Sequence, residues 1–161
     1  MQGSDFDEDE FFRVISACGA RALLIGRRAV IALGVPVMTS DYDFWVHPDD
    51  IGLLNAACAR FDLVPNKTPE EARRVGRYVL ENDEHVDVLV ARAVFTVDGE
   101  KVVFDELWER RIRVGEAPGP EVAIPSVPDL IATKRFALRP KDLEDIRNLR
   151  VLFNLGDEGQ G

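Results

Sequence analysis

The sequence predicts a mixed α/β or α+β domain in which a small sheet is covered by helices. Of the 161 residues, 46% are hydrophobic, which is enough to form one sizeable core. Apolar segments with helical spacing alternate along the chain with short β-branched or aromatic runs. We find no internal repeat and no low-complexity segment. We therefore treat residues 1–161 as a single domain, and we expect disorder at 1–5 and 156–161.

The first sixty residues alternate between helix and strand. Apolar residues at helical spacing precede Gly19, which is suited to end a helix, and a short apolar run follows it. Aromatic and β-branched residues follow the loop that contains Pro36, and they favour a strand. Asp49 or Asp50 can cap the next helix. The predicted elements are a helix over 11–18, a strand over 22–25, a short helix over 29–33, a strand over 42–46 and a helix from 49 or 50 to about 60.

The rest of the chain contains more of the predicted strands. A loop is expected over 61–68, and Asn82-Asp83 is a turn signal between two strands. Asp98-Gly99 indicates a hairpin turn, Ser126 can cap a helix, and Pro140 opens a last helix with an apolar stripe. The stripe comprises Leu143, Ile146, Leu149, Leu152 and Phe153. Strands are predicted over 77–80, 85–90, 95–97, 102–104, 112–114 and 122–124.

Composition narrows the range of functions. No apolar run approaches the roughly 20 residues of a membrane span, and the acidic N-terminus lacks the basic region of a secretory signal. We therefore expect a cytoplasmic protein with no membrane partner. Cys18 and Cys58 lie in apolar helical segments, which favours buried thiols over a disulfide or a zinc site.

The charge balance argues against general nucleic-acid binding. The net charge is −9, whereas nucleic-acid affinity comes mainly from neutralising phosphates. An anionic substrate is still compatible with this sequence, because basic residues cluster locally and can create a local positive potential. The basic clusters are at 27–28, 73–77, 110–113 and 134–141.

The informative stretch for chemistry is 40–46, Ser-Asp-Tyr-Asp-Phe-Trp-Val. Residues i and i+2 of a strand point to one face, so Asp41 and Asp43 direct two carboxylates at the same volume, while Tyr42 and Phe44 face the core. Two close carboxylates repel each other unless something neutralises them. Mg²⁺ or Mn²⁺ takes such oxygen ligands and leaves positions for phosphates, so the spacing predicts a metal site.

Asp87 is the candidate for a third ligand. It lies among valines in the predicted strand 85–90, where a carboxylate without a partner is costly. A shared metal would supply that partner and complete a two-metal site of the kind used in nucleotidyl transfer. The alternative is an aspartate on an edge strand that faces water.

Two parts of the chain together resemble the nucleotidyltransferase superfamily. Residues 22–46 are similar to its opening signature of strand, glycine turn, helix, second glycine and Thr-x-Asp-x-Asp, here Gly26, Gly34 and 39–43. Residues 126–134 and 139–146 are similar to its Leu-x-x-x-Lys and Arg-x-Lys-Asp-x-x-Asp helices. The resemblance is strongest to the small bacterial branch of AbiEii-type toxins and MNT-like proteins. It implies a small mixed sheet flanked by helices.

The resemblance also implies roles for named residues. A nucleoside triphosphate would bind where Gly26 allows close approach of the backbone, with metal at Asp41, Asp43 and Asp87. Lys134 would reach a phosphate or the acceptor. Residues 141, 142 and 145 (Lys141, Asp142 and Asp145) would lie near the site or fix the last helix to it, or else form a solvated helix face.

One position departs from the family pattern. A small residue usually follows the first glycine, but Arg27 stands there, followed by Arg28. These side chains could block the phosphates, contact them or point to solvent. Two functions therefore stay open. The first is a metal-dependent transferase that moves a nucleoside monophosphate from an NTP to a hydroxyl or amine of RNA, a protein or a small molecule. The second is an inactive nucleotide- or partner-binding module, for instance a toxin–antitoxin component that binds an antitoxin or small regulator.

Overall fold

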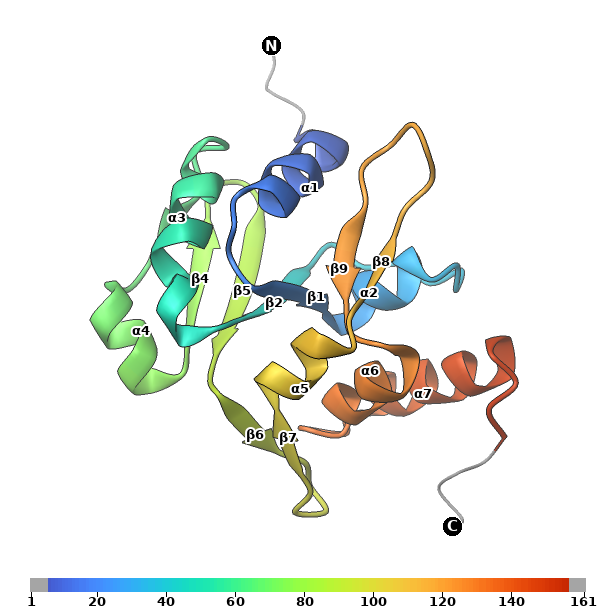
Figure 1. The fold of residues 1–161 in the computed structure, drawn as a ribbon. Coiled ribbons are helices and arrows are strands. Elements are labelled where there is room, and N and C mark those ends of the chain that lie inside the picture. The colour runs from blue at the N-terminus through green and yellow to red at the C-terminus, as the bar shows by residue number, and fades with distance from the viewer. Residues whose placement is uncertain (1–5, 157–161) are drawn as a thin grey trace.

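The computed structural model describes residues 6–156, so residues 1–5 and 157–161, where disorder was predicted, lie outside the described part (Figure 1). Within the described residues, no helix has the length and apolar character needed to cross a membrane. The helices are α1 (Glu8–Ala17), α2 (Gly26–Ala32), α3 (Ile51–Ala59), α4 (Pro69–Val75), α5 (Phe104–Glu109), α6 (Val127–Lys134) and α7 (Pro140–Leu152), with a 3₁₀ turn η1 at Pro48–Asp50. The strands are β1 (Ala22–Ile25), β2 (Tyr42–Val46), β3 (Val64–Pro65), β4 (Arg77–Glu81), β5 (His85–Val90), β6 (Ala93–Phe95), β7 (Lys101–Val103), β8 (Ile112–Val114) and β9 (Val122–Ile124).

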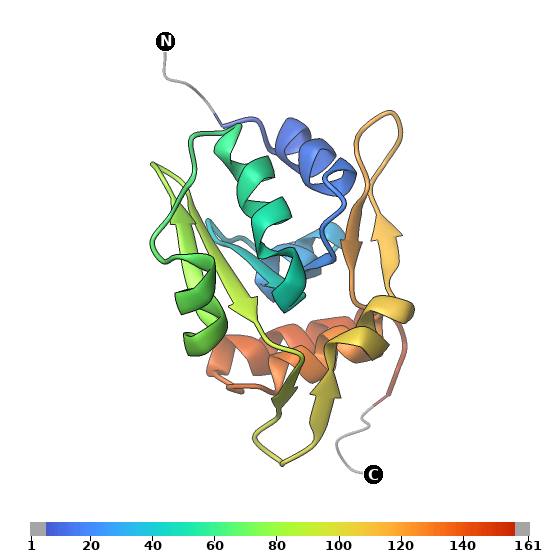
Figure 2. The ribbon, with the colours of Figure 1, turned by 60° about the vertical axis from the view of Figure 1, so that its left-hand side comes forward.

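A five-stranded mixed sheet forms the centre of the fold, with strand order β1-β2-β5-β4-β3. β2 and β5 are parallel, and the other neighbouring pairs are antiparallel. Two separate ribbons, β6–β7 and β8–β9, pack beside the helices (Figures 1 and 2). This architecture confirms the predicted α+β class with a small sheet flanked by helices.

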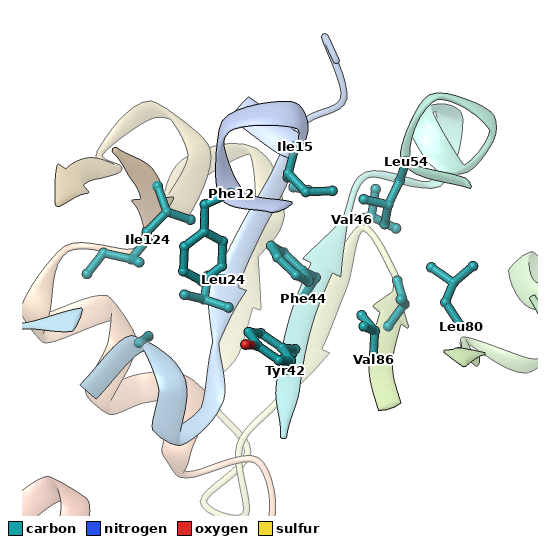
Figure 3. Packing of buried hydrophobic residues seen from close by; sticks show 14 of the residues in the cluster. Phe12, Ile15, Leu24, Tyr42, Phe44, Val46, Leu54, Leu80, Val86 and Ile124 are labelled. Atoms are coloured by element: carbon teal, nitrogen blue, oxygen red, sulfur yellow. The ribbon is translucent and has the colours of Figure 1, made fainter. Parts of the chain in front are cut away.

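The two faces of the sheet are buried in different ways. One face carries Tyr42, Phe44 and Val86, which pack beneath α1 and α3 in the main core (Figure 3). The opposite face is covered only in part, by a second cluster that includes Trp45 and Phe104. Because Asp43 alternates with the core residues of β2, its carboxylate lies on this second face.

Several elements differ from the prediction. Helices α4 and α5 were not predicted, because each buries only one or two apolar side chains and so has little hydrophobic period. The capping box of Thr68 and Glu71 starts α4, and the expected loop over 61–68 contains the short strand β3. Cys58 is buried as predicted, Cys18 is half-buried, and both thiols are free.

The predicted apolar stripe of α7 is wrong in part. Leu143 and Leu152 are 44% and 50% exposed. The inner face of the helix instead includes Asp142 and Asp145, together with Ile146 and Leu149. Helix α7 therefore docks through buried charges as well as apolar contacts.

An ion pair between Arg21, which directly precedes β1, and Asp50 of η1 makes stability depend on pH. The buried Asp50 carboxylate accepts hydrogen bonds from the backbone and guanidinium of Arg21, and the side-chain bond is the main cause of its lowered pKa. A lowered carboxyl pKa adds stability above the unfolded-state value of about 4, and that stability is lost as pH falls through the folded-state pKa. We expect Asp50→Asn to lower the free energy of unfolding by about 1–2 kcal/mol at pH 7. Urea titrations at pH 7 and pH 3 check this, and an equal loss at both pH values would contradict it.

Candidate active site

Asp43 and Asp87 are direct neighbours across the parallel strands β2 and β5. Their Cα atoms are register partners, and Asp41 lies one residue before β2. Tyr42 and Phe44 are buried on the opposite face, as the alternation predicted. The alternative placed Asp87 on an edge strand facing water, and its first half is wrong, because β5 lies between β2 and β4. The Asp87 side chain is nevertheless 48% exposed.

Asp43 carries the clearest electrostatic signature of the site. Burial raises the pKa of its carboxyl to about 6, and the charges of Asp87 and then Asp41 add to that rise. Lys141 and Lys134 act in the opposite direction with less effect. The negative charge at this point is therefore incompletely compensated by the protein, and a carboxylate in that state favours a bound cation.

The oxygen donors of these aspartates suit a hard divalent cation such as Mg²⁺. As placed, however, no three acidic, histidine or cysteine side chains of the described residues form a cluster that could hold a metal ion. Asp87 Oδ1 instead lies 3.3 Å from His85 Nε2, and His85 Nδ1 lies 3.2 Å from Glu81 Oε2. The donor chemistry fits a divalent metal, and a shared ion would compete with His85 for the Asp87 carboxylate.

Gly26 is required by its contact with Asp43. Its φ is +71°, a conformation that glycine adopts at little cost, and an added Cβ would lie 2.4 Å from Asp43 Oδ2. Any other residue here would collide with the Asp43 carboxylate. The glycine of the predicted signature therefore makes room for Asp43.

Lys134 and Lys141 both line the site but in different states. Lys134 is buried, and its Nζ lies 2.8 Å from Oδ2 of the fully buried Asp145. Burial lowers the pKa of Lys134, and the hydrogen bond to Asp145 opposes that shift. Lys141 is exposed at the start of α7. Lys134 thus fixes α6 to α7, and Lys141 is the more accessible cation.

Arg27 and Arg28 do not line the pocket around Asp43. Arg27 turns to α7, where it pairs with Asp145 at 2.9 Å and with Glu144. Arg28 donates to the backbone carbonyls of Thr39 and Asp41, and its guanidinium lies over the Tyr42 ring. Both guanidinium groups are held by contacts within the protein. The Arg27 and Arg28 side chains are only 18% and 17% exposed, so the alternative that both point to solvent is wrong.

The departure at Arg27 can be tested by restoring a small residue. We expect Arg27→Ser to lower the free energy of unfolding by about 1–3 kcal/mol, because the buried Asp145 keeps Lys134 as a partner but loses its second cation. Nucleotide affinity should change less than about threefold, since Arg27 lies outside the pocket. Chemical denaturation and calorimetry check the two effects, and a large gain in nucleotide affinity would show that Arg27 obstructs the phosphates.

The carboxylates lie in a pocket of about 370 Å³ between the open face of the sheet and the α6–α7 corner. Sequence reasoning did not identify Lys67, Arg77 and Arg139 as part of it. Arg77 could have been found, because the hairpin around Asn82-Asp83 brings it to the face that carries Asp87. The polar lining comprises Asp41, Asp43, Lys67, Arg77, Asp87, Thr133, Lys134, Arg139, Lys141 and Asp142.

Comparison with solved structures supports the fold that the sequence resemblance implied. The chain is similar to the lincosamide antibiotic adenylyltransferase LnuA, with TM-score 0.59, 14% identity, and 90% of this chain and 96% of that chain covered. It is also similar to the antibiotic-resistance factor ANT(2″)-Ia, with TM-score 0.58, 16% identity, and 91% and 84% covered. The chain has the nucleotidyltransferase fold. No protein-family model and no curated protein matches the sequence. The resemblance to AbiEii-type and MNT-like proteins stays a prediction.

Proposed function

We propose that this protein is a cytoplasmic nucleotidyltransferase that moves a nucleoside monophosphate from an NTP to an acceptor hydroxyl or amine, with Mg²⁺ or Mn²⁺ as cofactor. The observation that carries the proposal is the in-register pair of Asp43 and Asp87 at a pocket edged by lysines. Asp43 has a raised pKa there, as is typical of carboxylates at functional sites. The fold is one that also supports adenylyl transfer in LnuA.

The side chains of the pocket have different roles in the proposed reaction. Asp41, Asp43 and Asp87 would hold the metal, which supplies electrophilic stabilisation of the phosphates and of the leaving group. The acceptor oxygen or nitrogen forms a bond to the α-phosphorus, the bond from the α-phosphorus to the bridging oxygen breaks, and pyrophosphate leaves with that electron pair. Asp87 accepts the acceptor proton, since its side chain lines the pocket and is 48% exposed. Lys141 binds the phosphates as a point charge.

The size of the pocket favours a small acceptor. A volume of about 370 Å³ is at the lower end of the range for small-molecule sites, which is roughly 300–1,000 Å³. Two solved structures of neighbours contain small molecules of this kind, lincomycin with LnuA and adenylyl-2″-tobramycin with ANT(2″)-Ia. The inactive-module alternative depended on Arg27 in the phosphate site, and Arg27 lies outside the pocket.

Transfer of label from an α-³²P NTP in the presence of Mg²⁺ tests the proposal. We expect labelled product and pyrophosphate with the wild-type chain, and their loss in EDTA or in Asp87→Asn. The matched control is Asp83→Asn, which makes the same change in an exposed turn beside β5. Tight NTP binding without turnover would replace this proposal with the inactive module. Labelling that survives Asp87→Asn would remove the base assigned here.

A further inference from the structure

The β4 side of the pocket carries two cationic side chains that the proposed reaction does not use. Arg77 lies on β4, and Lys67 lies in the segment between β3 and α4; both line the pocket. In the sheet, β4 and β3 lie on one side of β5, whereas β2 with Asp43 lies on the other. Asp87 therefore lies between the β4 side, which carries Arg77, and Asp43 on β2.

Register places Arg77 within reach of a molecule bound at Asp87. Val79 is the partner of Asp87, and Arg77 is the partner of Leu89, so Arg77 and Asp87 share one face of the sheet. Diagonal neighbours of this kind are roughly 7–8 Å apart. A small acceptor with its hydroxyl at Asp87 would thus place its other end beside the Arg77 guanidinium.

The cations on this side are available to a ligand. Among the described residues, neither the Arg77 nor the Lys67 side chain makes a hydrogen bond or an ion pair. Lys67 only influences the pKa of nearby Glu71, whose carboxylate already binds Thr68. On the opposite side of the pocket, Lys134 is paired with Asp145 in the interior.

The positive charge of Arg77 and Lys67 contrasts with the negative charge of the chain as a whole. The net charge of the chain is −9, so two unpaired cations in one pocket differ from what its overall composition would produce. Two unpaired cations beside a pocket attract an anion and repel a cationic ligand. A guanidinium also matches the two oxygens of a phosphate or carboxylate.

We propose that the acceptor of this enzyme carries a phosphate or carboxylate group, which binds Arg77 and Lys67 while its hydroxyl or amine faces Asp87. This inference rests on the proposed transferase function and specifies its acceptor. A polycationic acceptor would bring like charges against Arg77, which is unfavourable.

A sugar series that differs in charge tests the inference. The probes are glucose 6-phosphate, glucose and glucosamine, titrated into the protein with and without Mg²⁺ and α,β-methylene-ATP. We expect glucose 6-phosphate to bind roughly tenfold more tightly than glucose, and glucosamine to bind most weakly. Two-dimensional NMR should show the largest shifts at the Arg77 side chain. Equal affinity for glucose 6-phosphate and glucose would overturn the proposal.

Charge-matched variants locate the effect. Replacing Lys67 and Arg77 together with glutamine should remove the preference for glucose 6-phosphate, while affinity for α,β-methylene-ATP stays within about threefold. The control replaces Arg60 and Arg147 with glutamine, an equal charge change at exposed residues outside the pocket. An unchanged preference in the Lys67/Arg77 variant would overturn the assignment.

Failure of the inference and failure of the proposed function give different results. Nucleotide binding and Mg²⁺-dependent transfer to glucosamine in preference to glucose 6-phosphate would overturn this inference and leave the transferase function standing. A preference for glucose 6-phosphate at Arg77 without any binding of α,β-methylene-ATP would overturn the transferase function. It would then also overturn the assignment of the β4 side of the pocket to an acceptor.

Discussion

Replacing Asp43 with asparagine is expected to reduce nucleotidyl transfer by at least about 100-fold, because it removes a carboxylate from the proposed metal site and metal stabilisation of the transition state is worth several kcal/mol. The same change is expected to stabilise the fold. Burial and the charges of Asp87 and Asp41 raise the pKa of Asp43 to about 6, so the ionised form is disfavoured in the native state. Asparagine keeps the shape without the charge. Activity and stability should therefore move in opposite directions, as is common at active sites.

The sign of the effect follows from linkage. Asp43 has a raised pKa, so its ionisation costs the folded state stability above pH 6, and this cost disappears as pH falls from about 6 towards the unfolded value of about 4. A rise of about two pKa units corresponds to at most about 3 kcal/mol at pH 7.5, and we expect about 1–3 kcal/mol. Thermal unfolding at pH 7.5 and pH 4.5, without divalent cations, measures the gap between wild type and Asp43→Asn.

Adding metal distinguishes an electrostatic cause of the stability change in Asp43→Asn from a packing effect. Mg²⁺ or Mn²⁺ should raise the melting temperature of the wild type, because an ion that binds only the folded state stabilises it by mass action. It should have little effect on Asp43→Asn. The matched control is Asp105→Asn, an exposed aspartate outside the pocket, which should retain the wild-type response to metal. An Asp43→Asn variant that is less stable than wild type at pH 7.5 would contradict the electrostatic destabilisation proposed for this carboxylate.

Local pattern was sufficient for the parts of the site that lie within one strand. The period of two in β2 predicted that Asp41 and Asp43 share a face, and the alternation in β5 placed Asp87 opposite its valines. The pairing of β2 with β5 was not predictable in the same way. These strands are parallel and separated by η1, α3, β3, α4 and β4, so their register depends on tertiary packing.

The buried ion pairs could not be predicted from the sequence. Arg27 and Asp145 are 118 positions apart, and nothing in the local pattern of either segment indicates that they pair. The structure shows that the Arg27 side chain leaves the glycine turn and fixes α7 to α2. The same pairing accounts for the buried Asp145 on the inner face of α7. The neighbouring Asp142 is buried against Arg139 instead. The pattern assigned both positions to solvent or to the site. The residue that departs from the predicted signature thus has a structural role here.

Replacing Gly26 with alanine should damage the site through a single contact. The left-handed backbone at φ +71° costs a non-glycine residue about 1 kcal/mol, and the new Cβ would lie 2.4 Å from Asp43 Oδ2, which adds about 1–3 kcal/mol of overpacking. We expect a loss of about 2–4 kcal/mol in the free energy of unfolding and a loss of transfer activity comparable to that of Asp43→Asn. Chemical denaturation and the label-transfer assay measure the two effects.

Gly19 supplies the matched control for this prediction. Its φ is +86°, and nothing lies within 4 Å of its added Cβ, so Gly19→Ala contains the backbone cost without the collision. It should lose only about 1 kcal/mol and keep full activity. The difference between the two alanine variants isolates the contact with Asp43.

A double-mutant cycle then assigns the collision to the carboxylate. Truncation of Asp43 to alanine removes Oδ2, which the Gly26→Ala methyl meets first, but keeps Cβ at 3.0 Å. The double variant should therefore recover part of the overpacking cost, with a coupling energy of about 1–3 kcal/mol. Stability would return without activity, since the double variant still lacks a ligand. Additive losses would mean that Gly26 is required for its backbone alone. Strong coupling would mean that position 26 requires glycine because the Asp43 side chain occupies the space of a Cβ. The first glycine of the predicted signature would then depend on the second aspartate of the Asp-x-Asp pair.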